Sequence, residues 1–274
     1  MSTDTGTLYV VATPIGNLGD ITRRAAEILG KVDIVAAEDT RHSRKLLAAL
    51  GLSPNLLSYR EHNREGAGRK ILQELSRGRD VAVITDAGTP GISDPGHHLV
   101  ALCLREGITV TPVPGPCAAT TLMSVSGIEL TRFLFQGFLP PKAGARKETL
   151  LELAASGYPV VLYESPNRVM ATLREIAAVM GDRKLVLGRE ITKMHEQFVR
   201  GTALEVAGGL QQHQIRGEVT ILVEGAPPRQ RHVDLVAAVK RLRKEGLSAS
   251  KTAAVLAQIT GEDRKEIYKM ASEL

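Results

Sequence analysis

The amino-acid sequence predicts an α/β fold of two α/β domains followed by a small helical module. Short apolar runs alternate with stretches of helical periodicity over residues 8–126, a pattern typical of a parallel sheet with connecting helices. A second series of strands and helices follows, and beyond a Gly- and Pro-rich linker at 225–231 only helical patterning remains. We therefore expect domains at residues 1–118, 119–228 and 229–274.

The elements of the first domain follow from the spacing of its apolar residues. Runs such as LYVVA and VAVI have strand character, and apolar residues spaced three and four apart mark the helices between them. The expected strands cover residues 8–12, 32–36, 55–59, 81–84 and 108–112, and the expected helices cover 21–29, 43–50, 66–77, 95–106 and 116–126.

The second domain and the helical module are predicted in the same way. A helix at 168–180 places Val169, Leu173, Ile176 and Met180 on one stripe, which indicates core packing. The segment FLPPKAGARKE at 138–148 is expected to be a loop, and the run GREITKMHEQFVRG receives no assignment. The remaining strands are expected at 133–136, 159–163, 184–188 and 218–223, and the remaining helices at 149–156, 202–210, 232–245, 248–259 and 262–272, the last three similar to a helix-turn-helix module.

Composition limits the class of protein. A chain of 274 residues that is 43% hydrophobic can bury a sizeable core. No apolar run approaches the roughly 20 residues of a membrane helix, and the start MSTDTGT lacks the basic and apolar regions of a signal peptide, so we expect a cytoplasmic protein. Cys103 and Cys117 form no CxxC pair and no His/Cys cluster, so neither a disulfide framework nor a metal centre is expected.

The positive charge is concentrated at the C-terminal end. From Arg229 onward there are ten Lys and Arg against six Asp and Glu, which accounts for +4 of the net charge of +5. A basic module on a nearly neutral body favours a polyanionic partner, and nucleic acid is the first candidate. A solvated helical face rich in Lys and Arg explains the same charge equally well.

Three turn-rich segments follow expected strands in the first domain. They read TPIGNLGD at 13–20, TDAGTPGISDPG at 85–96 and VPGPCAA at 113–119. Gly and Pro are too dense there for the interior of an element, and they let a ligand approach the backbone closely. Since ligands of open α/β sheets bind beyond the carboxyl ends of the strands, the turns predict a cofactor pocket.

The residue types in the turns narrow the kind of cofactor. Pro14 interrupts the dinucleotide fingerprint GxGxxG, although Glu38 and Asp39 could serve as a ribose-binding acid or as an ordinary helix cap, and no phosphate loop GxxxxGK is present. Asp86 and Thr89 suit amino and hydroxyl groups, whereas Asp94 is expected to cap a helix that starts at Pro95. Small residues at Cys117 and Ala118 leave room for a flat group such as adenine, or for close helix packing.

Taken with AAEDTRHSRKLL, FLP, YESPNR, GREITKMHE and RGEVTILVEG, these turns resemble the tetrapyrrole-methylase superfamily from about residue 7 to the C-terminus. The resemblance implies a homodimeric, two-domain α/β methyltransferase with S-adenosylmethionine in a cleft between the domains. TDAGTP and PGPCA replace the usual GDP and PGVSS, as in the branch that methylates ribosomal RNA. The implied reaction is methylation of the ribose 2'-hydroxyl of a cytidine in small-subunit ribosomal RNA.

The resemblance also implies which positions bind the cofactor. Asp86 is expected near its methionine end and the others near its ribose and adenine. The implied residues are Pro14, Ile15, Gly16, Asp86, Ala87, Gly88, Thr89, Cys117, Ala118, Tyr163, Glu164, Gly217 and Glu218.

A hydroxyl group is a poor nucleophile while protonated, so a base would help the reaction. The candidates come from EDTRH and GREITKMHE, and we select Glu38, His42 and Glu190. An ordinary surface or core histidine explains His42 as well.

Basic residues are expected to hold the RNA backbone by phosphate contacts rather than by stacking, because only 3% of the residues are aromatic and Trp is absent. Two alternatives remain open at this point. One is a methyltransferase for a tetrapyrrole or another small molecule, and the other is a ligand-sensing, nucleic-acid-binding regulator. The expected RNA-binding residues are Arg41, Lys142, Arg146, Lys147, Lys240, Arg241 and Arg243.

Overall fold

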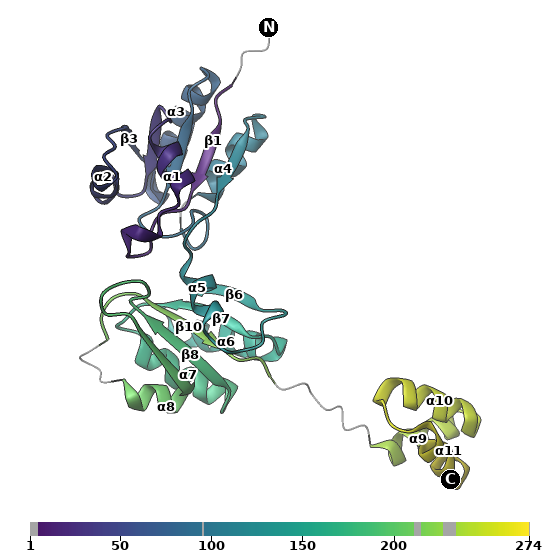
Figure 1. The fold of residues 1–274 in the computed structure, drawn as a ribbon. Coiled ribbons are helices and arrows are strands. Elements are labelled where there is room, and N and C mark those ends of the chain that lie inside the picture. The colour runs from purple at the N-terminus through teal and green to yellow at the C-terminus, as the bar shows by residue number, and fades with distance from the viewer. Residues whose placement is uncertain (1–4, 95, 211–214, 227–233, 274) are drawn as a thin grey trace. The chain divides into compact units, whose positions relative to one another are not determined.

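The computed structural model describes residues 5–94, 96–210, 215–226 and 234–273. Its contacts divide the chain into two compact units, Met1–Ala226 and Pro227–Leu274 (Figure 1). The first unit holds both α/β sheets, and the described residues of the second, 234–273, form helices and their connections. In the described parts of the chain, no helix is long and apolar enough to cross a membrane.

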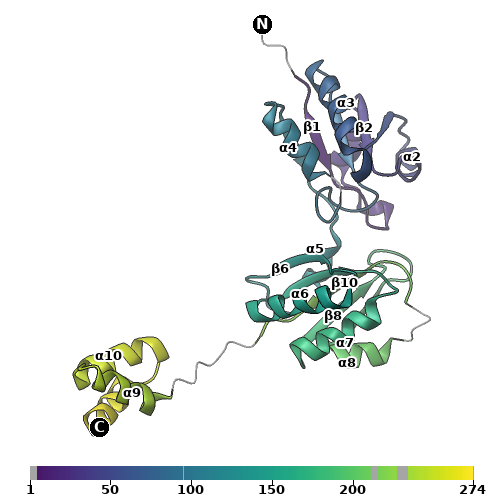
Figure 2. The ribbon, with the colours of Figure 1, turned by 180° about the vertical axis from the view of Figure 1, so that it is seen from behind.

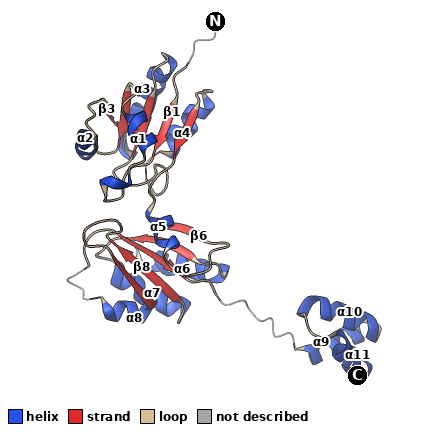
Figure 3. Ribbon diagram, viewed as in Figure 1, coloured by secondary structure: helices blue, strands red, loops and turns tan. Residues whose placement is uncertain are grey.

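The first sheet has five parallel strands in the order β3-β2-β4-β1-β5. Its central strands β2 and β4 are buried at every position, as in sheets covered by helices on both faces. Helices α3 and α4 supply apolar residues to the core of one face, and α1 and α2 to the core of the other (Figure 3). The elements are β1 (Leu8–Val11), α1 (Arg23–Leu29), β2 (Ile34–Ala37), α2 (Thr40–Ala49), β3 (Asn55–Ser58), α3 (Arg64–Ser76), β4 (Val81–Ile84), α4 (His97–Arg105) and β5 (Val110–Val113).

The second sheet is mixed, in the order β6-β7-β10-β8-β9, with β6 parallel to β7 and the other pairs antiparallel. Helices α6, α7 and α8 cover one face (Figure 2), where the stripe Val169, Leu173, Ile176 and Met180 is buried as expected. Helix α5 packs on the other face with Leu122. The elements are α5 (Ala118–Ser124), β6 (Leu134–Phe138), α6 (Ala143–Ser156), β7 (Val160–Glu164), α7 (Val169–Met180), β8 (Lys184–Arg189), β9 (Gln197–Thr202), α8 (Ala203–Gly209) and β10 (Val219–Val223).

One element of this domain was not predicted, and one expectation was wrong. Strand β9 covers the end of the run that received no assignment, together with Thr202. It gave no clear signal because it is a half-exposed edge strand in which only Phe198 and Val199 are large and apolar. Helix α6 begins at Ala143, inside the expected loop. Its buried positions Arg146, Leu150 and Leu153 share one face, but the arginine concealed that periodicity.

Within residues 234–273, the second unit forms the short helices α9 (Leu235–Lys244), α10 (Ala249–Thr260) and α11 (Arg264–Glu273) around a small core that includes Val239, Leu256 and Ile267. The side chains of Asp234 and Ser248 accept N–H groups of the first turns of α9 and α10, which fixes where these helices start. Residues 227–233, which hold most of the expected linker and the start of the expected helix, lie outside the described residues.

Candidate active site

The three turns lie against one another in the folded chain. The N–H of Thr13 donates to the carbonyl of Gly88 at 2.9 Å, and the N–H of Gly88 donates to the carbonyl of Thr13 at 3.1 Å. The Thr89 hydroxyl donates to the carbonyl of Pro116 at 3.2 Å, which ties the second turn to the third. Segments that lie far apart in the sequence therefore form one continuous wall.

This wall borders a cavity of about 400 Å³ that is lined by residues of turns following the first sheet's strands and by residues of the second sheet, both within the first unit. All the residues that were expected to bind a cofactor line it, except Pro14 and Gly16. The lining also includes Ser93, Asp94 and Phe138, which sequence reasoning did not assign to the site. For Asp94 a signal was available, because it belongs to the same turn as Asp86.

The expected role of Asp94 as a helix cap was wrong. Helix α4 begins at His97, its N-cap is Gly96, and Pro95 lies outside the described residues. The side chain of Asp94 instead borders the cavity. Asp39, by contrast, is an ordinary cap, because its carboxylate accepts the N–H of Arg41 at 2.8 Å at the start of α2.

Carboxyl groups gather on this side of the cavity. Burial, followed by the nearby charges of Glu38 and Asp86, raises the pKa of Asp94 to about 7. Burial, followed by the charge of Asp86, also raises the pKa of Glu38. Asp86 is held in place because its Oδ1 accepts the N–H of Asp39 at 3.1 Å. Mutual repulsion of this kind favours the entry of a cation.

Aromatic rings form another part of the lining. Phe138 and Tyr163 meet edge to face, with ring centroids 5.7 Å apart, and Phe135 meets the same tyrosine at 5.2 Å. The Tyr163 hydroxyl lies 3.8 Å from the sulfur of Cys117. Burial of this hydroxyl, with the neighbouring Cys117, raises the pKa of Tyr163, so the ring stays neutral at physiological pH.

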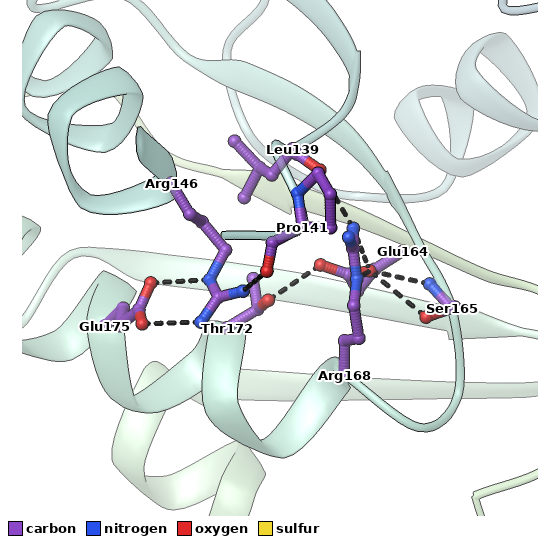
Figure 4. A network of polar contacts seen from close by, with 8 residues as sticks. All are labelled: Leu139, Pro141, Arg146, Glu164, Ser165, Arg168, Thr172 and Glu175. Atoms are coloured by element: carbon purple, nitrogen blue, oxygen red, sulfur yellow. Dashed lines mark hydrogen bonds and ion pairs between the residues drawn. The ribbon is translucent and has the colours of Figure 1, made fainter. Parts of the chain in front are cut away.

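Glu164 borders the cavity, but its carboxylate is occupied by protein partners (Figure 4). Oε1 accepts the N–H of Ser165 and Nε of Arg168, each at 2.7 Å, and Oε2 accepts the Thr172 hydroxyl at 2.7 Å. Arg168 in turn donates to the carbonyl of Leu139 at 3.0 Å. Glu164 therefore positions the segment that follows β6 and leaves little acceptor capacity for a ligand.

Arg146 does not fit the expected contact with RNA. Only 6% of the residue is exposed, and its guanidinium donates to both carboxylate oxygens of Glu175, at 2.6 and 2.7 Å. A further bond reaches the carbonyl of Pro141 at 3.2 Å (Figure 4). Arg146 thus also holds the segment that follows β6, through the carbonyl of Pro141. It can do so because the helical turn of α6 directs its side chain toward the protein interior.

Glu190 supports the cavity from outside its lining. Its Oε1 accepts Nζ of Lys193 at 2.8 Å and the N–H of Glu218 at 3.1 Å. Burial raises the pKa of Glu190, but these hydrogen bonds and the charges of Lys193 and Arg189 together outweigh it and hold that pKa below its ordinary value. A side chain at Gly217, which has φ +80°, would collide with this carboxylate. Glu190 therefore fixes the turn that carries Gly217 and Glu218 into the lining.

The other predicted residues lie on the surface. His42 and Arg41 are exposed on α2 and do not line the cavity, and Arg41 lies 3.5 Å from the carboxylate of Asp39. Lys142 and Lys147 are exposed at the start of α6. In the second unit, the exposed side chains of Lys240 and Arg243 help to line a hollow of about 430 Å³, and Arg241 is exposed on the same helix.

Comparison with known proteins shows which families the chain is similar to. Residues 7–207 match the model described as tetrapyrrole (corrin/porphyrin) methylases, and residues 231–274 match the one described as the RsmI C-terminal HTH domain. A Synechocystis protein named ribosomal RNA small subunit methyltransferase I is 42% identical over 274 residues, which cover 98% of each chain. Its namesake from Escherichia coli O157:H7 is 40% identical over 273 residues, or 98% of this chain and 95% of its own.

Solved structures share the fold of the α/β unit. A cobalt precorrin-4 methyltransferase superposes with a TM-score of 0.61 at 21% identity, covering 80% of this chain and 94% of its own. A uroporphyrin-III C-methyl transferase from Thermus thermophilus, complexed with S-adenyl homocysteine, has a TM-score of 0.57 at 22% identity and covers 79% of this chain and 97% of its own. At these identities the likeness concerns the fold alone.

Proposed function

The chain belongs to the tetrapyrrole methylase family, and from this premise we propose that it methylates the ribose 2'-hydroxyl of a cytidine in small-subunit ribosomal RNA, using S-adenosylmethionine. The extent of the similarity carries the proposal. Three relatives named as ribosomal RNA small subunit methyltransferases cover 97–98% of this chain, and the match of residues 231–274 extends the similarity to the helical module. An RNA substrate accounts for that basic module, whereas a tetrapyrrole substrate does not.

The chemistry of the cavity fits the cofactor. Asp86, Asp94 and Glu218 offer carboxylates to a molecule that carries a sulfonium and an ammonium cation, and Cys117 and Ala118 leave room for adenine. The Thermus thermophilus enzyme with the same fold was determined with S-adenyl homocysteine, which supports this assignment. When bound, S-adenosylmethionine supplies an electrophilic methyl carbon.

Two carboxyl groups of the cavity suit the removal of the hydroxyl proton. Of Glu38, His42 and Glu190, only Glu38 lines the cavity. Asp94 lies there too, and a pKa of about 7 is close to the value at which a general base works best. In the proposed step Asp94 would accept the hydroxyl proton while the ribose oxygen takes the methyl group, and S-adenosylhomocysteine would leave. The charge of Glu38 supports this role, because it helps to raise the pKa of Asp94.

Basic side chains supply a surface for the RNA backbone. Arg41, Lys142 and Lys147 are exposed on the first unit, and Lys240, Arg241 and Arg243 on the second. Contacts of this kind bind phosphates without reading sequence. We also propose that the enzyme acts in the cytoplasm as a homodimer, as the family resemblance implies, and light scattering of the purified protein tests the oligomeric state.

Methyl transfer from labelled S-adenosylmethionine tests the proposed activity. The acceptors are small ribosomal subunits from cells that lack this enzyme, the RNA extracted from them, and uroporphyrinogen. We expect label in the RNA of at least one of the first two acceptors, released on digestion as 2'-O-methylcytidine. Label in uroporphyrinogen alone, or in a nucleoside methylated on its base, would overturn the proposal.

A further inference from the structure

Aromatic side chains are scarce in this protein, yet they concentrate at strand β6. Three of the four phenylalanines, Phe133, Phe135 and Phe138, lie in or directly before this edge strand. All three are substantially exposed, and Phe138 most of all at 54%. Only Phe138 also lines the cavity. An apolar ring held in contact with water at the rim of a site suits a flat ligand.

An irregularity in the strand directs this ring into the site. The register of β6 against β7 shifts between Phe135 and Gly137, so that Phe135 and Phe138 both contact Tyr163 despite their odd spacing. In a regular strand, residues three apart point to opposite faces. Bulges often re-aim a side chain beside an active site.

The same irregularity brings β6 against the acidic side of the cavity. Gly137 has φ +68°, and a Cβ there would lie 2.6 Å from the Ser93 hydroxyl. Ser93 itself has φ +64° and directly precedes Asp94, the proposed proton acceptor. Phe138 is thus placed on the side of the cavity where the attacking hydroxyl must lie.

Tyr163 lies between the part of the lining that has room for adenine and the part that is formed by the Phe138 ring. Its hydroxyl is next to Cys117, where small residues leave room for adenine, and its ring meets the edge of Phe138. The segment that follows Phe138 is fastened by Arg168 through the carbonyl of Leu139 and by Arg146 through that of Pro141. The ring is therefore exposed on a backbone that is held in place.

We propose that Phe138 is the platform on which the base of the target nucleotide stacks when its ribose enters the cavity. The proposal rests on the RNA methyltransferase function and adds a single stacking contact to recognition that otherwise relies on phosphates. Stacking is tolerant of sequence, because every base offers a π-face. Stacking on Phe138 orients the nucleotide, whereas the choice of which nucleotide is methylated depends on other contacts.

Variants at Phe138 test the platform, with Phe133→Ala as the matched control directly before the same strand and outside the cavity. Phe138→Ala and Phe138→Leu should both raise the KM for small subunits, on the order of 5- to 100-fold, because neither keeps a planar ring. The Kd for S-adenosylmethionine should change less than about twofold, well below the effect of losing a stacked base. Activity of Phe138→Leu equal to the wild type would overturn the proposal, as would an equal loss in Phe133→Ala or a loss confined to cofactor affinity.

A spectroscopic test does not depend on methyl transfer. The chain has no tryptophan, so Phe138→Trp introduces a single reporter at an exposed position. With S-adenosylhomocysteine present, oligocytidylate should quench its emission and leave that of Phe133→Trp unchanged. Equal quenching in both variants, or none in a Phe138→Trp enzyme that still methylates subunits, would overturn the platform.

The two proposals can fail separately. Selective quenching without methyl transfer to RNA by the wild type would overturn the proposed activity and leave the platform standing. A change of oligomeric state in Phe138→Ala, with the subunit KM unchanged, would show instead that the ring covers a second copy of the chain.

Discussion

At the scale of single residues, Asp94 is expected to control the pH dependence of the reaction. Its pKa of about 7 means that the group is protonated in acid and ionised above neutrality. A base must be ionised to accept a proton, so kcat/KM for the cofactor should fall as pH drops below about 7. With the cofactor saturating, the limb should move to lower pH, because a bound cation stabilises the carboxylate. Initial rates between pH 5 and 9, measured at low and at saturating cofactor concentration, give the position of the acid limb under both conditions.

The variant Asp94→Asn should remove this limb and lower kcat by roughly 100-fold or more, the usual contribution of a general base. Asp182→Asn, a change at an exposed acid outside the lining, is the control and should keep the wild-type profile. A limb that persists in Asp94→Asn would assign the base to another group, and Glu38→Gln would then be the next variant to measure.

At the scale of elements, the network around Glu164 should stabilise the segment between β6 and α6. The side chain of Glu164 is fully buried, and it pairs with Arg168, which is 25% exposed. Glu164→Gln leaves that guanidinium without its anion, so we expect the free energy of unfolding to fall by about 2–3 kcal/mol. Urea denaturation measures the change.

The control for this network is Glu61→Gln, which removes an ion pair with Arg64 at the surface. Surface pairs contribute little, so its effect should stay within about 0.5 kcal/mol. Equal losses in the two variants would contradict the structural role assigned to Glu164.

The elements that the sequence predicted are those whose signal is local. Strand β4 was expected at residues 81–84 and is found there, because a run buried on both faces between turns is visible without its neighbours. Strand β9 and the start of α6 were not, because an edge strand has a weak apolar pattern and because an arginine, here paired with Glu175, stands at a buried position of α6.

The same distinction applies to the site. The turns were recognisable because strand ends and Gly/Pro density can be read from consecutive residues, and half of the lining residues belong to these turns. Phe138 depends on a register shift, and Asp94 on a helix that starts later than its Pro suggested. The register shift is set by the pairing of β6 with β7 and so does not follow from local pattern. Asp94, by contrast, stands in the same turn as Asp86, and it was misassigned because the proline after it suggested an earlier start for the helix.

At the scale of the whole molecule, the basic module should supply part of the salt dependence of RNA binding. Lys240, Arg241 and Arg243 are exposed on α9, which is stabilised by its own small core. Replacing all three with Gln should weaken RNA binding and make the plot of log K against log salt shallower by about 0.7–0.9 per lost phosphate contact, while cofactor affinity stays unchanged. Filter binding to small-subunit RNA between 50 and about 300 mM salt measures the slope.

Removing residues 227–274 should weaken RNA binding and reduce its salt dependence at least as much, because it takes away all ten Lys and Arg of the module. Cofactor affinity should stay unchanged, because the module forms a compact unit separate from the one that holds the cavity. The double variant Lys142→Gln/Lys147→Gln is the companion on the first unit. If both units contact the same RNA, it should make the plot of log K against log salt shallower by an amount that adds to the effect of the triple variant. An unchanged slope in the triple variant would assign the phosphate contacts to the first unit alone, and the charge of the module would then have to be explained as an ordinary solvated helical face.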